Sequence, residues 1–255
     1  MLSNLIEILI LSLIQGVSEF LPISSSAHLV IISNLYEFKS NSILIDISLH
    51  LGSLLAILFY FKKEILDFQN NQKIFKLIII GSIPIIFVGY IVYNTNLIYL
   101  FRDIKVIAWT TLIFGIILYI SDRNTSSKNI QSNLNFKTIL FIGSFQVLAL
   151  IPGVSRAGIA ITAGRLLKFN RVESSKISFL LSIPALIGAS VLSLKDILKE
   201  SLEFNYTVLI AIALSFLFSY LTVRFFLKYI SKFSMNIFVF YRIIIAIILF
   251  ISIYN

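Results

Sequence analysis

Hydrophobic positions along the chain form long uninterrupted stretches, and most polar positions fall between them. Six stretches are long enough, with their flanking residues, to cross a bilayer as helices: 46–61, 77–93, 106–121, 177–194, 206–223 and 236–253. Two other apolar stretches, 5–33 and 138–164, are each interrupted midway by a proline that serines follow. Since neither half of these two stretches can span a bilayer alone, the pattern predicts two re-entrant helical hairpins.

The composition agrees with a protein that lies within the membrane. Hydrophobic residues make up 58% of the 255 residues and charged residues only 13%, and the mean hydropathy is +0.96. These values lie far from those of soluble domains and leave no room for a separate soluble domain. The chain contains no cysteine, which excludes disulfides, thiolate metal sites and cysteine nucleophiles.

Basic residues in the loops predict the orientation of the spans. The loops 62–76, 122–137, 165–176 and 224–236 hold 14 of the 21 Lys and Arg residues. Lys and Arg accumulate in cytoplasmic loops, so we expect the 138–164 hairpin to start and end inside and the other hairpin to start and end outside. The net charge of +9 is therefore interpreted as contact with anionic lipid headgroups rather than with nucleic acid.

A repeat within the sequence supports two hairpins of opposite direction. Pro22 and Pro152 lie 130 positions apart, as do Ser25 and Ser155. Coincidence in an Ile-, Leu- and Ser-rich chain is the alternative reading, but an offset without gaps favours a repeat. Each half would contain one hairpin and three spans, and the odd number of crossings inverts the second half relative to the first.

The predicted fold class is therefore an all-α polytopic membrane protein. It has an inverted-topology repeat with six transmembrane helices and two re-entrant helical hairpins. A single integral membrane domain is expected over 1–255, with the first repeat at about 5–121 and the second at about 138–253. The tips of the two hairpins, 5–33 and 138–164, should meet inside the membrane.

The first hairpin carries a concentrated polar segment, "QGVSEFLPISSSAH". Gln15 and Glu19 share one helix face because they are four residues apart. Pro22 ends this half-helix, so Ser24 or Ser25 is expected to cap the next one. The free amides of a helix N-terminus attract anions, above all phosphate.

The second hairpin repeats this device with "IPGVSRAG". We expect Gly153 to let a ligand approach the backbone, Ser155 to cap the helix and Arg156 to bind phosphate oxygens with its guanidinium. Together the two tips suit phosphoryl chemistry. An acidic residue can hold a divalent cation, and Ser or His can act as a nucleophile or as an acid or base.

The segments "EFLPISSSAH" and "LALIPGVSRAG" closely resemble those of the undecaprenyl-diphosphatase (bacitracin-resistance) family of bacterial membrane enzymes. The resemblance extends over essentially the whole chain. It implies hydrolysis of undecaprenyl diphosphate to undecaprenyl phosphate and inorganic phosphate, which recycles the lipid carrier of peptidoglycan synthesis. It also implies a divalent cation, Mg or Ca, and a multi-pass protein of the bacterial cytoplasmic (inner) membrane whose active site opens to the outer face.

This chain departs from the family pattern at three positions. Ala157 and Ala160 stand where the family commonly has hydroxyl residues, and Gln15 stands where the family also allows an acidic residue. A second carboxylate is therefore missing, so Glu19 would carry the charge of the cation largely alone.

The candidate site follows from the two motifs and the resemblance. The expected catalytic residues are Glu19, Ser25, His28 and Arg156, with Glu19 also the metal ligand. The expected substrate-binding residues are Gln15, Ser24, Ser26, Gly153 and Ser155. As a mechanism we expect Ser25 to attack the terminal phosphate with the help of His28. The alternative is that His28 activates water or is itself the nucleophile.

Other interpretations stay open at this level. An inverted-repeat carrier or flippase for a phosphorylated lipid or anion would need the anion site but no nucleophile. A structural membrane subunit would explain the hydropathy alone, and homodimer formation is left open. Glu19 and Arg156 could form a purely structural ion pair. His50 is expected to serve helix packing or water contact, and Arg242 to reach the lipid headgroups or to pair with a carboxylate.

Overall fold

The structure, a computed structural model, describes residues 2–25, 27–28, 32, 43–95, 97, 101, 103–200 and 206–254. Apart from turns and one isolated bridge between Lys128 and Phe169, this part of the chain is helical. Ser26, a candidate substrate-binding residue, lies outside the described residues, as does most of the chain between residues 29 and 42.

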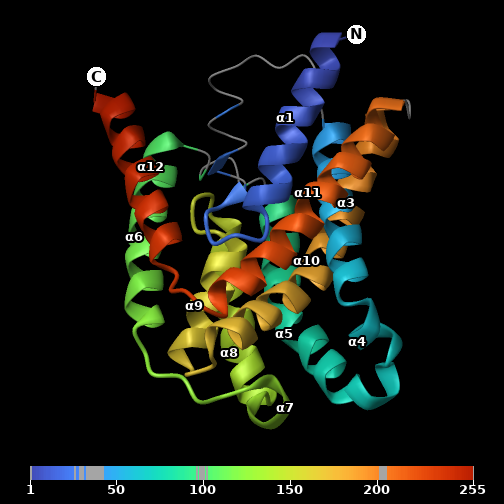
Figure 1. Cartoon of the computed structure of the whole chain (residues 1–255). Coiled ribbons are helices and arrows are strands. Elements are labelled where there is room, and N and C mark those ends of the chain that lie inside the picture. Colours follow the sequence, from blue (N-terminus) through green and yellow to red (C-terminus); the bar gives the residue numbers. More distant parts are fainter. Residues whose placement is uncertain are drawn as a thin grey trace.

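Long helices and a few short ones make up the described part of the chain (Figure 1). In chain order they are α1 (Leu2–Ser18), α3 (Ile43–Tyr60), α4 (Lys62–Leu66), α5 (Phe68–Asn94), α6 (Ile104–Asp122), α7 (Ile130–Asn133), α8 (Phe136–Gln146), the 3-10 helix η2 (Val147–Leu150), α9 (Arg156–Leu166), α10 (Arg171–Glu200), α11 (Tyr206–Ile230) and α12 (Asn236–Tyr254). The closest pairs are α3 with α11, α12 with α6, α1 with α11, α10 with α9 and α5 with α8.

Five described helices are long and apolar enough to cross a membrane, which confirms a multi-pass all-helical membrane protein. They correspond to five of the six predicted spans and lie at Gln69–Asn94, Ile104–Asp122, Arg171–Leu192, Tyr206–Ile230 and Asn236–Tyr254. The sixth predicted span, 46–61, forms α3, whose described apolar part, Leu44–Tyr60, is shorter.

Two helices are interrupted at the predicted prolines. Helix α1 ends at Ser18, and the chain turns before helical structure resumes at Ser25. Helix α8 continues into η2 and turns before α9 begins at Arg156. In Figure 1, α1 descends from the end of the molecule that holds both termini, whereas α8 starts at the opposite end beside α7. The turns at Pro22 and Pro152 are both buried.

Small residues let α1 and α3 pack closely against α11. A Cβ added to Gly16 or to Gly52 would lie 2.5 Å from the nearest atom of α11. The hydroxyl oxygens of Ser53 and Ser219 lie 2.9 Å apart across the α3–α11 contact. Such close backbone approach and interhelical hydroxyl bonds are typical of helices that associate in lipid. There the hydrophobic effect does not drive helices together, so association depends on close packing and hydrogen bonds.

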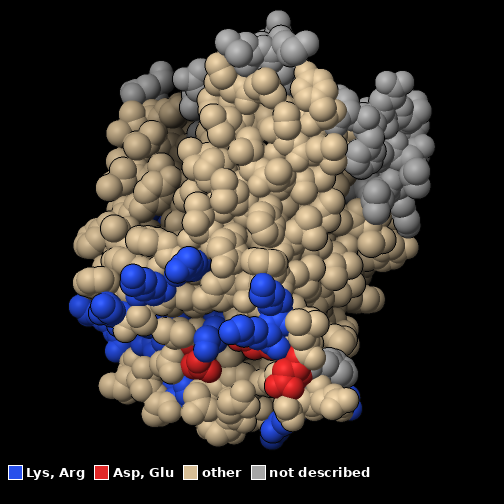
Figure 2. All heavy atoms as spheres, turned by 45° about the vertical axis from the view of Figure 1, so that its right-hand side comes forward, with Lys and Arg blue, Asp and Glu red and all other residues tan. Residues whose placement is uncertain are grey.

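Positive charge gathers at one end of the molecule. On the face shown in Figure 2, Lys and Arg side chains form a band across the lower part, and the surface above this band is free of charged side chains among the residues drawn in colour. This is the end where α4 and α7 lie in Figure 1. The basic loops of the sequence therefore come together on one side, as a membrane protein with a fixed orientation requires.

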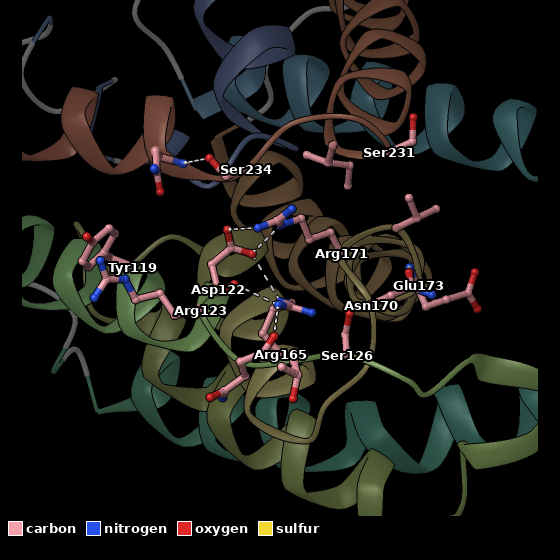
Figure 3. Close-up of a pocket in the computed structure, with 15 residues that line it drawn as sticks. Tyr119, Asp122, Arg123, Ser126, Arg165, Asn170, Arg171, Glu173, Ser231 and Ser234 are labelled. Atoms are coloured by element: carbon pink, nitrogen blue, oxygen red, sulfur yellow. Dashed lines mark hydrogen bonds and ion pairs between the residues drawn. The ribbon is translucent and has the colours of Figure 1, made fainter.

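Asp122, at the end of α6, organises a buried ion cluster at this basic end (Figure 3). Its carboxylate accepts hydrogen bonds from Arg171 at 2.7 and 2.9 Å and from the backbone N–H of Met235 at 3.1 Å. Arg165 lies 3.3 Å from the same carboxylate and donates to the carbonyls of Asp122 and Asn124. One carboxylate thus ties α6 to α9, α10 and the connection before α12.

The Asp122 cluster lines an open cavity of about 650 Å³. The arginines that line it already have partners, because Arg165 and Arg171 bond to Asp122 and Arg123 lies over the ring of Tyr119 at 4.7 Å. We therefore interpret the cluster as a structural element that joins helix ends.

Replacing Asp122 by Asn should strongly destabilise the protein, because the buried guanidinium of Arg165 and the partly exposed one of Arg171 would lose their carboxylate. We expect the free energy of unfolding to fall by about 3 kcal/mol, measured as thermal unfolding in detergent. The matched control is Glu173→Gln, which removes the ion pair with Lys176 at 3.3 Å, worth about 0.5 kcal/mol. The amide oxygen of Gln can still accept the Ile130 N–H that Glu173 binds at 2.9 Å. Equal effects of the two changes would contradict the central role of Asp122.

Candidate active site

A cavity of about 570 Å³ opens beside the two proline turns. Its polar end is formed by Glu19, Ser24, Ser25, Ser155 and Arg156. The rest is lined mainly by apolar residues of α5, η2 and α10. All five polar residues lie at the edge of a helix interruption or within one. The breaks in the helices therefore place the polar groups at one end of an apolar cavity.

Gln15 and Glu19 lie at the buried end of α1, where their spacing predicts a shared face. The Gln15 side chain donates to Glu19 Oε2 at 3.1 Å, and the Glu19 N–H donates to the Gln15 carbonyl at 2.9 Å. Gln15 is completely buried and Glu19 is only 6% exposed. Gln15 therefore lies behind Glu19 and holds its carboxylate at the cavity.

Glu19 joins the two interrupted helices. Its Oε1 forms an ion pair with Arg156 at the start of α9, and its Oε2 accepts a hydrogen bond from the Ser25 hydroxyl at 2.6 Å. Arg156 also donates to the Ser182 carbonyl of α10 at 3.4 Å. Three of the four predicted catalytic residues, Glu19, Ser25 and Arg156, thus lie in direct contact although they come from opposite halves of the sequence.

The two capping serines occupy equivalent places in the two turns. Ser24 has φ 76° and Ser155 has φ 71°, left-handed conformations that residues with a Cβ rarely adopt. Ser24 Oγ accepts from the Ala27 N–H at 3.4 Å, and Ser155 Oγ accepts from the Gly158 N–H at 3.1 Å. Of the two caps considered from sequence, Ser24 and Ser25, the structure forms the cap at Ser24. One residue therefore separates Pro22 from its cap in the first turn, whereas two residues separate Pro152 from Ser155 in the second.

His28 does not contact the Ser25 hydroxyl. Its Nδ1 lies 2.6 Å from the Ser24 carbonyl, which can only accept, so Nδ1 carries the proton. Its Nε2 then accepts from the Tyr241 hydroxyl at 2.5 Å, and the two rings stack at 5.6 Å. Both ring nitrogens are engaged, and the expected Ser25–His28 pair is replaced by Ser25–Glu19.

Gly153 packs against α6, and its expected role in ligand approach stays a prediction. Its φ of +90° lies in the region that glycine favours. A Cβ at this position would overlap Thr110 Oγ1 and lie 2.8 Å from the Ile107 carbonyl of α6. The space beside Gly153 is therefore filled by protein.

Sequence reasoning missed two residues of this region. His50 of α3 lines the cavity, with its Nδ1 held at 2.8 Å by the Asp46 carbonyl. Arg242 neither reaches the surface nor pairs with a carboxylate in the described part of the chain, since it is 1% exposed and bonds to carbonyls. The only signal for either residue was an ionisable group inside an apolar span.

Comparison with known proteins agrees with the motifs. The sequence profile of the bacitracin resistance protein BacA matches residues 8–248. An undecaprenyl-diphosphatase of Pelagibacter ubique is 68% identical over 256 residues that cover 100% of both chains. An undecaprenyl-diphosphatase of Elusimicrobium minutum is 40% identical over 97% of both chains, and one of Alteromonas mediterranea is 39% identical over 96% of this chain and 97% of its own. The family resemblance seen in the sequence is confirmed.

Replacing Gly153 by Ala should distort the second turn, because the new Cβ must displace α6 or change the backbone. We expect the free energy of unfolding to fall by about 2 kcal/mol or more, measured by thermal unfolding in detergent. Gly89→Ala is the control at the cavity wall, where the nearest atom to a new Cβ is 3.7 Å away. This control should leave stability unchanged or raise it by up to about 1 kcal/mol. A Gly153→Ala protein as stable as the control would contradict the packing role.

Proposed function

The chain belongs to the bacitracin resistance protein BacA family, and we propose that it hydrolyses undecaprenyl diphosphate to undecaprenyl phosphate and inorganic phosphate. The Pelagibacter ubique relative that bears the name undecaprenyl-diphosphatase is 68% identical over the whole chain. The structural observation that carries the proposal is the contact of Ser25 and Arg156 with one buried carboxylate, Glu19. This contact brings together a nucleophile, Ser25, a base, Glu19, and a guanidinium that can bind phosphate, Arg156.

The shape and lining of the cavity suit a lipid with a charged head. Behind the polar end, α5 contributes Ile85 and Ile86, and α10 contributes Leu186 and Leu192. An isoprenoid chain can lie against these side chains in or next to the membrane interior. The diphosphate then reaches Glu19 and Arg156 without leaving the lipid phase.

The geometry favours Ser25 as the nucleophile and Glu19 as its base. In the first step Ser25 Oγ would bond to the terminal phosphorus, the bond to the bridging oxygen would break and undecaprenyl phosphate would leave. The Ser25 proton would pass to Glu19 Oε2, which already accepts the Ser25 hydrogen bond at 2.6 Å. Glu19 would next give this proton to the departing undecaprenyl phosphate. Water would then attack the phosphoserine and give one proton to the Glu19 carboxylate, the bond between phosphorus and Ser25 Oγ would break, and Ser25 Oγ would take that proton back as inorganic phosphate leaves.

Arg156 has a natural role in this sequence. Its guanidinium pairs with Glu19 and can form two parallel hydrogen bonds to a phosphate group. Transfer of Arg156 from the carboxylate to the terminal phosphate would free Glu19 as a base and neutralise charge on the transferring group. His28, bound to Ser24 and Tyr241, would then position the Ser24 turn rather than take the serine proton.

The residues present fit a divalent cation, Mg or Ca. Gln15 Oε1 is buried without a hydrogen-bond partner in the described part of the chain, and it lies on the side chain that bonds Glu19. Hard cations select oxygen ligands such as the Gln15 amide oxygen and the Glu19 carboxylate. Because no group of three or more His, Asp or Glu residues gathers among the described residues, phosphate oxygens of the substrate would complete the coordination. A cation held there would neutralise phosphate charge.

We further propose six membrane crossings, with both interrupted helices re-entering the membrane from opposite faces as halves of an inverted repeat. The opposite directions of α1 and α8 in Figure 1 support this arrangement, as do the matching caps Ser24 and Ser155. The basic end in Figure 2 would face the cytoplasm. The protein would lie in the bacterial inner membrane with its cavity open to the outer face.

Purified protein in detergent should release phosphate from undecaprenyl diphosphate when a divalent cation is present, and a chelator should stop the release. Glu19→Gln and Arg156→Ala should each reduce the rate about 100-fold or more, because each removes charge from the reacting groups. Ser231→Ala, at an exposed position of the basic end, is the control and should retain the wild-type rate. If folded wild-type protein released no phosphate, the result would favour a carrier. A carrier does not hydrolyse its substrate, and in detergent no transmembrane gradient exists to drive transport.

Rapid quenching with a labelled terminal phosphate should trap the label on Ser25. Ser25→Ala should abolish labelling because the Ser25 hydroxyl is the one held by Glu19. His28→Gln should lower the rate of labelling but keep the label on Ser25. A label on His28 would make the histidine the nucleophile, and the absence of any label would indicate direct attack by water.

A further inference from the structure

Arg242 of α12 lies at the point where the two proline turns meet. It is 1% exposed, and its guanidinium nitrogens donate to five backbone carbonyls. These are the carbonyls of Thr110 at 3.4 Å, Thr111 at 3.1 Å, Pro22 at 3.4 Å, Gly153 at 2.9 Å and Val154 at 3.2 Å. One side chain therefore binds the first turn, the second turn and α6 at the same time.

The surroundings of Arg242 leave room for its large side chain. A Cβ added to Gly115 of α6 would lie 3.3 Å from Arg242 Cβ, and one added to Gly158 of α9 would lie 3.1 Å from Arg242 Nη1. Both contacts are tighter than ordinary van der Waals distance. The glycines at these two places let α6 and α9 approach the guanidinium closely.

The charge of Arg242 is not neutralised by a partner in the described part of the chain. Its acceptors are neutral carbonyls, and the ion pairs of the described residues do not include it. The carboxylate of Glu19 is paired with Arg156. A buried cation without a counter-ion is costly, and the same charge attracts an anion such as a diphosphate to the turns.

The carbonyl bonds also orient the second turn. The C=O and N–H of a trans peptide point in opposite directions. Because the Val154 carbonyl faces Arg242, the N–H of Ser155 points away from Arg242, and no acceptor for it occurs among the described residues. Ser155 lines the cavity, so a residue of the cavity wall keeps an unused backbone donor next to Arg156.

The neighbouring residue of α12 acts on the first turn as well. The Tyr241 hydroxyl bonds to His28, and His28 bonds to the Ser24 carbonyl. Consecutive residues of α12 thus contact both the turn that carries Ser25 and the turn that carries Arg156.

We propose that Arg242 is a positioning residue of the phosphatase reaction. It holds the two proline turns at the separation that lets Glu19 meet both Ser25 and Arg156, and it adds positive charge that draws the diphosphate into the cavity. This proposal rests on the proposed function. It gives Arg242, which touches no reacting atom, a role in the reaction as well as in the packing of the two turns.

The test is steady-state hydrolysis of undecaprenyl diphosphate by Arg242→Lys and Arg242→Gln beside wild type. The Lys variant keeps the charge but loses the fork that reaches both turns, so kcat should fall about 100-fold while KM stays near wild type. The Gln variant also loses the charge, so KM should in addition rise about tenfold. Arg224→Gln, at an exposed position of α11, is the control for charge and should keep both constants.

A role limited to stability gives a different pattern. It would reduce the folded fraction, so kcat per total protein would fall in both Arg242 variants while KM kept its wild-type value in both, and this result would overturn the proposal. Inactive wild-type protein would instead contradict the proposed function.

If both Arg242 variants fail to fold, Gly115→Ala tests the same side chain with the arginine intact. Its new Cβ would lie 3.3 Å from Arg242 Cβ, and the three atoms nearest to it all belong to Arg242, so kcat should fall at least about tenfold with KM unchanged. A folded Gly115→Ala protein with wild-type kcat would overturn the positioning role.

Discussion

Backbone groups that a helix leaves unpaired must find partners when the helix ends inside an apolar environment, and the rest of the structure depends on this constraint. Two helical segments end in this way, α1 before the turn with Pro22 and η2 before the turn with Pro152, so carbonyls and amides of both turns become free. Ser24 and Ser155 satisfy amides at the start of the following helical turns. Arg242 satisfies carbonyls of both turns with a single guanidinium.

The same solution creates the chemistry of the cavity. Because the two turns share Arg242, Glu19 of the first turn comes within reach of Arg156 of the second. The pairing lowers the cost of burying each charge, and it leaves one buried cation in excess among the described groups. A site that binds a diphosphate benefits from such an excess, since the substrate itself supplies the missing negative charge.

The opposite end of the molecule uses charge differently. There Arg165 and Arg171 both pair directly with Asp122, which also accepts from the backbone of Met235, so one carboxylate connects helix ends. At the turns Glu19 pairs with Arg156, whereas the guanidinium of Arg242 bonds to neutral carbonyls among the described residues. An arginine that pairs with a carboxylate stabilises the scaffold, whereas a buried arginine without one leaves positive charge that favours an anion.

Much of this protein can be predicted from the sequence because membrane helices obey local rules. The apolar stretches locate the spans, the prolines locate both interruptions, and the motifs around Glu19 and Arg156 identify the family. Pairing across the molecule depends on how helices distant in sequence pack, which no local pattern records. Only the tertiary structure decided that Ser25 faces Glu19 instead of His28, that Gly153 packs on α6, and that Arg242 binds both turns. The physical reason is that each of these contacts joins elements that lie far apart in the chain or depends on the three-dimensional path of a turn.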